Sequence, residues 1–298
     1  MSNNVWLALS QLIKLIRQDQ PTALVKPYPR LRNFILDIMR EGRKKNTINL
    51  ILETDVQIIK EHLSRYKIVT GEIVSLTSYI AKSFACTIQQ DLSIQAYRQG
   101  KSKLIVFDEI DLSVMVEREI DEEKIPVVQI IRNANNKSAS QIHGELQKAK
   151  LTPLGAEGPL SAMDKLFFEM PTLIRRLVWK YIRYDPYLFK QVVGTVGITS
   201  MGMFSVGQSV VFPITPMTLT LSIGSIGKQV VLVDEKAIER EIIWLNLGAD
   251  HDIIDGAPLM RFADRFKIIL ANGSALFLDI DNGVSSDLEE IIPSSAIK

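Results

Sequence analysis

The chain has 298 residues, of which 46% are hydrophobic, and 35 Lys and Arg against 34 Asp and Glu leave a formal net charge of +1. This balance excludes bulk electrostatic attraction to nucleic acid or to an acidic membrane surface. The lone cysteine, Cys86, excludes an intramolecular disulfide and permits a reducing compartment. The first residues lack a basic segment before their short apolar run, so we expect no secretory signal and a cytoplasmic protein.

Apolar periodicity and breaker residues predict alternating helices and strands along the first half of the chain. We expect helices at 5–17, 31–39, 55–66, 76–92 and 140–150. We expect strands at 47–53, 104–106, 112–117 and 127–132. A linker around Pro153 and Gly155 then breaks regular structure.

The segment 191–227 carries no charged side chain and exceeds the ~20 residues that span a bilayer. Glycines and prolines interrupt it repeatedly, so we expect no membrane span but buried strands at 194–199, 209–212 and 218–223 joined by turns. Further strands are predicted at 229–234 and 241–247. A helix is predicted at 257–270, with Pro258 in its first turn.

His251 lies in the sequence Gly-Ala-Asp-His-Asp-Ile-Ile-Asp-Gly, directly after an apolar strand-like run. An imidazole titrates near neutrality, so His251 is a candidate general base. Asp255, four residues later and just before a glycine, is expected to support the turn through side-chain to backbone bonds. By itself the pattern is also typical of an ordinary structural histidine.

About fifty residues upstream, the sequence Gly-Thr-Val-Gly-Ile-Thr-Ser-Met-Gly-Met-Phe begins at Gly194. In order and spacing the two motifs resemble the catalytic domain of the acyltransferase component of 2-oxoacid dehydrogenase complexes, which has a chloramphenicol acetyltransferase-like fold. The sequence Ile-Arg-Asn-Ala from Ile131 matches the central stretch of that domain. The resemblance implies an α/β sandwich with a mixed β-sheet flanked by helices.

The same resemblance suggests that residues 1–298 form a single catalytic domain with a helical insert at about 151–193. That stretch is longer and more hydrophobic than the family linker. Its residues 173–183 have the 3.6-residue spacing of an amphipathic helix. A free-standing relative with a different acceptor is therefore expected.

The resemblance assigns His251 as general base, Thr199 as oxyanion donor and Asp255 as the residue that holds the active-site loop. It implies a coenzyme A thioester as acyl donor, no metal, and a homotrimer or multiple of trimers with sites between subunits. Without the resemblance, the sequence favours an ordinary structural threonine on a strand at position 199. Ser200 is a weaker candidate, because alternation points it to the opposite face.

One departure from the family pattern affects the histidine motif. Asp252 stands where the family usually has arginine, so the ion pair of that arginine must be absent or rebuilt. Asp250 and Asp252 both flank the base, and at least one of them is expected to point away or to pair with a cation.

Other polar residues carry weaker signals. Neither His62 nor His143 has a second ligand at helical spacing, so metal binding is not expected. The basic run Arg40, Arg43, Lys44 and Lys45 could meet coenzyme A phosphates, although a solvated loop is favoured. The Glu-Thr-Asp sequence at 53–55 resembles a lipoyl-attachment site but is followed by Val56 where that site has lysine.

Three functions remain open. The leading one is transfer of an acyl group, such as acetyl, from a coenzyme A thioester to a hydroxyl of a small-molecule acceptor. The second is the catalytic core of a 2-oxoacid dehydrogenase complex with lipoyl domains on another chain. The third is a non-catalytic binding or scaffold relative.

Overall fold

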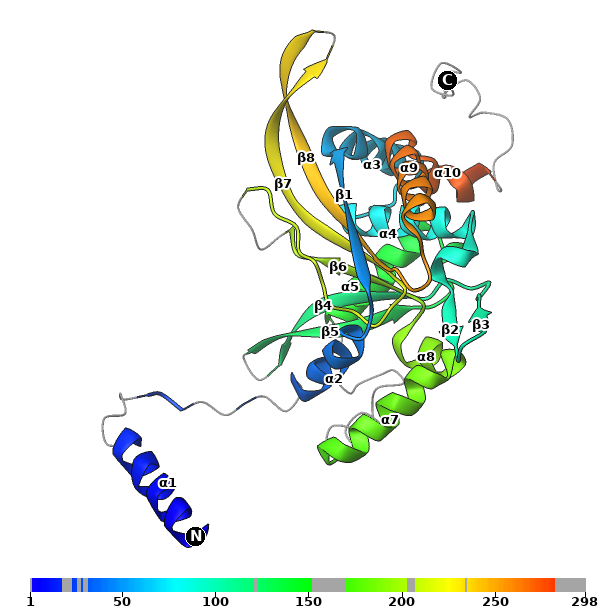
Figure 1. The fold of residues 1–298 in the computed structure, drawn as a ribbon. Coiled ribbons are helices and arrows are strands. Elements are labelled where there is room, and N and C mark those ends of the chain that lie inside the picture. Colours follow the sequence, from blue (N-terminus) through cyan, green and yellow to red (C-terminus); the bar gives the residue numbers. More distant parts are fainter. Residues whose placement is uncertain are drawn as a thin grey trace.

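The computed structural model describes residues 2–17, 23–25, 28, 32–120, 123–151, 170–202, 207–233 and 235–281 (Figure 1). The helices are α1 (Ser2–Arg17), α2 (Arg32–Gly42), α3 (Val56–Thr70), α4 (Leu76–Gln89), α5 (Ala139–Leu151), α7 (Thr172–Tyr184), α8 (Pro186–Val193), α9 (Gly256–Asn272) and α10 (Ser274–Asp281). The strands are β1 (Thr47–Asp55), β2 (Tyr97–Gln99), β3 (Lys103–Ile105), β4 (Leu112–Ile120), β5 (Glu123–Ile131), β6 (Val196–Ser200), β7 (Leu219–Val233) and β8 (Lys236–Asp250).

The main sheet is mixed and has the strand order β1-β8-β7-β6-β4-β5. Strand β6 runs parallel to both β4 and β7, whereas the β1–β8, β7–β8 and β4–β5 pairs are antiparallel. Helices α3, α4 and α9 lie on one side of this sheet in Figure 1, and β2 and β3 form a separate ribbon. The predicted α/β class with a mixed, helix-flanked sheet is confirmed.

Alternation along β7 separates a core face from a polar face. Leu219, Leu221 and Ile223 belong to the main hydrophobic core, together with Phe84 of α4 and Phe262 of α9. The intervening positions of β7 are polar, yet they are buried as well. Period-two alternation therefore aims apolar side chains at the helices and directs threonine and serine to the opposite face.

Helix α7 belongs to a second, smaller hydrophobic cluster. Its buried face carries Arg175, Trp179 and Ile182, which follow helical spacing. The Arg175 Nε lies 2.8 Å from Asp37 Oδ2 of α2, and both side chains are almost completely buried. This ion pair and the packing of Trp179 attach the amphipathic helix predicted at 173–183 to α2. The linker around Pro153 and Gly155 lies outside the described residues.

Two strand predictions were wrong. Residues 209–212 form no strand, and the Ser209 N–H donates at 2.8 Å to the side-chain Oγ of Ser225 and not to a ladder carbonyl. The strands predicted at 218–223 and 229–234 are one 15-residue strand, β7. Its Gly224 marks a close approach and not a turn, since a Cβ there would lie 2.3 Å from Ser209 O.

Within the described ranges, no helix combines the length and the apolar character needed to cross a bilayer.

Candidate active site

His251 lies immediately after the last residue of β8, in a tight turn that leads to α9. Its backbone N–H donates to Asn46 O at 2.7 Å, just beyond the last ladder pair of β1 and β8, Thr47 with Asp250. Its side chain is 47% exposed. The sheet therefore fixes the backbone of His251 while the imidazole stays accessible to a substrate.

The Asp255 carboxylate faces the imidazole from the start of α9. Asp255 Oδ1 lies 3.8 Å from His251 Nδ1, which is longer than a hydrogen bond. The expected side-chain bond from Asp255 to the backbone is not formed, although Asp255 occupies the N-cap position. Its side chain is 85% exposed. Because Nδ1 faces Asp255, Nε2 is the ring nitrogen available to a substrate.

The two carboxylates beside His251 have different environments. Asp250 is 3% exposed, and its Oδ2 lies 2.5 Å from Lys45 Nζ, so the expected pairing with a cation is present. Asp252 accepts a 2.8 Å hydrogen bond from Asn46 Nδ2. The backbone N–H of Asp252 donates to Asp250 Oδ1 at 3.2 Å. The turn is thus held by residues 45 and 46, which directly precede β1.

Thr199 is half-buried on β6, on the polar face of the sheet. It stands opposite Ser222 on β7, and Ser222 stands opposite Asn246 on β8. Ser222 Oγ and Asn246 Oδ1 are buried and have no hydrogen-bond partner within the described residues. Buried polar oxygens require a partner, so this row is suited to contact water or a polar ligand. Ser200 is half-buried on the opposite face.

One chain does not bring Thr199 and His251 together. The register places Thr199 level with Asn246, two strands away, and His251 follows five residues later. At about 3.3 Å per residue and about 4.8 Å per strand, their backbones are on the order of 19 Å apart. A base and an oxyanion donor must both lie within about 3 Å of the reacting group. Within one chain the two residues cannot serve the same reacting group.

The sequence motifs did not identify Asn46, Ser222 or Asn246, and they named Lys45 without connecting it to the His251 turn. The basic run was expected to be a solvated loop, but Lys45 pairs with Asp250, and Lys44 lies 2.5 Å from Glu41. Asp250 is the partner of Lys45 and Asp252 is the partner of Asn46, and each lies about 200 positions further along the chain. For Ser222, the alternation of polar and apolar residues along 218–223 was a usable signal.

The other two histidines have structural partners. His62 Nε2 contacts Ala271 O at 2.8 Å, and His143 Nδ1 accepts from the Ser75 N–H at 3.3 Å. Burial, followed by the charge of Lys150, lowers the pKa of His143 below its ordinary value. No group of three or more His, Cys, Asp or Glu suited to a metal ion occurs in the described part of the chain.

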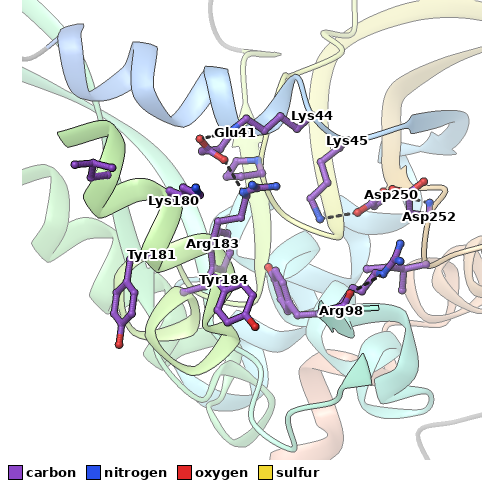
Figure 2. Close-up of a pocket in the computed structure, with 16 residues that line it drawn as sticks. Glu41, Lys44, Lys45, Arg98, Lys180, Tyr181, Arg183, Tyr184, Asp250 and Asp252 are labelled. Atoms are coloured by element: carbon purple, nitrogen blue, oxygen red, sulfur yellow. Dashed lines mark hydrogen bonds and ion pairs between the residues drawn. The ribbon is translucent and has the colours of Figure 1, made fainter. Parts of the chain in front are cut away.

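A pocket of about 570 Å³ adjoins the His251 turn (Figure 2). Asp250 and Asp252 lie on one side of it, and α7 forms the opposite side. Tyr97 also lines it and donates to Thr195 O at 2.7 Å. Burial raises the pKa of Tyr97 and the nearby charge of Asp250 adds to this, so the phenol stays protonated.

The chain is similar to acyltransferases of 2-oxoacid dehydrogenase complexes. The model of the family "2-oxoacid dehydrogenases acyltransferase (catalytic domain)" matches residues 190–278, which include Thr199, His251 and Asp255. The dihydrolipoyllysine-residue acetyltransferase component of the pyruvate dehydrogenase complex of Zymomonas mobilis is 23% identical over 273 residues. The match covers 89% of this chain and 54% of that protein, so the chain spans about half the length of this relative.

Solved structures show the same fold. The cubic core of the pyruvate dehydrogenase multienzyme complex superposes with a TM-score of 0.62 at 17% identity, covering 87% of this chain and 99% of that one. The dihydrolipoamide acetyltransferase of Azotobacter vinelandii also superposes with a TM-score of 0.62. That enzyme was studied for the catalytic role of a serine, a histidine and an asparagine. It is 16% identical and covers 87% and 99% of the two chains. The predicted resemblance and fold are confirmed.

Proposed function

We propose that this chain transfers an acyl group between a dihydrolipoyl thiol and coenzyme A, as the catalytic core of a 2-oxoacid dehydrogenase complex. The support is the accessible His251, whose Nδ1 faces Asp255, within the segment that matches the acyltransferase family. The Zymomonas mobilis relative acts on a dihydrolipoyllysine residue. This favours a thiol acceptor over the hydroxyl of a small metabolite, which the sequence alone had placed first.

The proposed chemistry needs one proton acceptor and one hydrogen-bond donor to the oxyanion. His251 Nε2 takes the proton from the coenzyme A thiol as its sulfur attacks the carbonyl carbon of the acyl-dihydrolipoyl thioester. A new C–S bond forms, and the carbonyl oxygen becomes an oxyanion. When the intermediate collapses, the old C–S bond breaks and the proton passes from His251 to the leaving dihydrolipoyl sulfur. Asp255 orients the ring and stabilises its charged form.

Thr199 would donate its hydroxyl hydrogen to the oxyanion of a site on a neighbouring copy. The separation of Thr199 from His251 within one chain supports this arrangement. A closed ring of copies would place Thr199 of each chain beside His251 of the next. The similarity to a cubic multienzyme core supports such an assembly. We therefore propose a homotrimer or a multiple of trimers, with residues 1–298 contributing one catalytic unit per copy.

A substrate panel tests this proposal. The purified chain is incubated with acetyl-CoA and dihydrolipoamide, or with small alcohols, and acylated products are identified by mass spectrometry. The proposal predicts acetyl-dihydrolipoamide and free coenzyme A. Products from alcohols alone would restore the hydroxyl-acceptor hypothesis. The absence of any transfer, in a protein that binds acyl-CoA, would favour the scaffold hypothesis.

A further inference from the structure

The pocket beside the His251 turn has a wall that the family match does not include. Leu177, Lys180, Tyr181 and Tyr184 of α7 line it, and α7 precedes the matched segment 190–278. The opposite face of the helix is fixed by the buried Arg175–Asp37 pair. The outward side chains of α7 are thus presented to the pocket by a well-anchored element.

The pocket has an excess of positive charge. Five cationic side chains and three carboxylates line it, which leaves a net charge of +2. Three of the cations are paired, because Lys44 and Arg183 share Glu41 and Lys45 pairs with Asp250. Lys180 and Arg98 have no carboxylate partner among the residues that the structure describes. Figure 2 shows them on opposite sides of the pocket, Lys180 on α7 and Arg98 on β2.

Aromatic side chains complete the lining. Tyr181 and Tyr184 are 64% and 69% exposed, while Tyr97 and Phe189 are buried and packed together, with ring centroids 4.9 Å apart. Exposed aromatic faces stack on flat rings, and unpaired cations bind phosphate oxygens through charge-assisted hydrogen bonds. A volume of about 570 Å³ suits a ligand of nucleotide size.

We propose that this pocket binds the phosphorylated end of a nucleotide, with Lys180 and Arg98 as separate phosphate contacts and the tyrosines of α7 beside the base. The assignment of coenzyme A as a source rests on the proposed function. Its 3′-phosphate and diphosphate would reach the two cations, and the pantetheine arm would have to extend out of the pocket to bring the thiol to His251. A free nucleotide carries the same chemistry and is the other source.

Calorimetric titration of the full chain tests this proposal with two probes, coenzyme A and ATP. Lys180→Gln and Arg98→Gln each remove one cation from the lining, and Arg176→Gln is the matched control. Arg176 is also exposed on α7 but does not line the pocket. We expect Kd to rise roughly tenfold or more in each of the first two variants, since each loses a charge-assisted hydrogen bond, and to stay unchanged in the control. Thermal melting confirms that each variant is folded.

The two probes identify the source of the ligand. Binding of coenzyme A alone assigns the pocket to the cosubstrate, whereas binding of ATP with the same dependence on Lys180 assigns it to a free nucleotide. Three results would overturn the proposal: no binding of either probe, binding that neither variant weakens, or equal weakening in Arg176→Gln. Because calorimetry needs no turnover, a protein that shows the expected binding without acyl transfer would refute only the proposed function.

Discussion

Lys45 Nζ lies 2.5 Å from Asp250 Oδ2, so the residue that precedes His251 is joined to the segment just before β1, 205 positions away in the sequence. Asp250 is 3% exposed and Lys45 is 21% exposed. The ion pair therefore supplies a cation at a turn where Asp252 replaces the arginine of the family pattern. With the bonds of Asn46, it fixes the backbone from which the imidazole projects.

Lys45→Met should destabilise the fold by about 2–4 kcal/mol, because it leaves the buried Asp250 carboxylate unpaired. The free energy of unfolding is measured by urea denaturation. The double variant Lys45→Met/Asp250→Asn should recover much of that loss, since neither charge remains. An unchanged free energy of unfolding in Lys45→Met would show that the pair does not hold the turn.

Thr199→Val removes a hydroxyl at nearly constant volume, whereas Thr199→Ser keeps it. Under the proposed oxyanion role, the first variant should lower kcat by about 10²-fold and the second only mildly. Steady-state kinetics of acetyl transfer to dihydrolipoamide give both values. Equal losses would indicate a packing role for Thr199 on β6.

Mixing inactive His251→Ala chains with inactive Thr199→Val chains tests the shared site. In randomly mixed rings, about a quarter of the boundaries would combine a functional His251 with a functional Thr199. Activity should therefore reappear after subunit exchange. A fully active monomer, shown by light scattering at the assay concentration, is incompatible with a site shared between copies.

Arg175→Met should lower the free energy of local opening of α7 by about 1–3 kcal/mol. The reason is that the buried Asp37 loses one of its two ion-pair partners, Arg175, and keeps Arg40. Hydrogen exchange of residues 172–184 should accelerate, while that of β7 and β8 should stay slow. Uniform acceleration across the chain would mean that α7 does not open independently of the sheet.

The sequence predicted the fold class and most elements because their periodicity is local. The strand at 47–53 and the helix at 257–270 appear as β1 and α9 with small shifts of boundary. Strand β7 was divided in two because Gly224 resembles a turn residue. Its role as a point of close approach depends on Ser209, which belongs to the separate segment before β7.

Only those residues of the candidate site that lie close together in the sequence could be predicted. His251 and Asp255 are four residues apart, so a motif could identify both. Lys45 and Asn46 reach the same turn only through the pairing of β1 with β8, which no short motif records. The row of Ser222 and Asn246 next to Thr199 likewise depends on strand register.

The most direct test of His251 as the general base is the rate of acetyl transfer from acetyl-CoA to dihydrolipoamide by the wild-type chain, His251→Ala and the control His62→Gln. General-base catalysis predicts a loss of about 10²-fold or more in His251→Ala, with unchanged folding and assembly. His62 Nε2 contacts Ala271 O and lies outside the site, so its variant should keep a rate close to that of the wild type. A His251→Ala variant that retains more than about a tenth of the wild-type rate would contradict the role of His251 as general base.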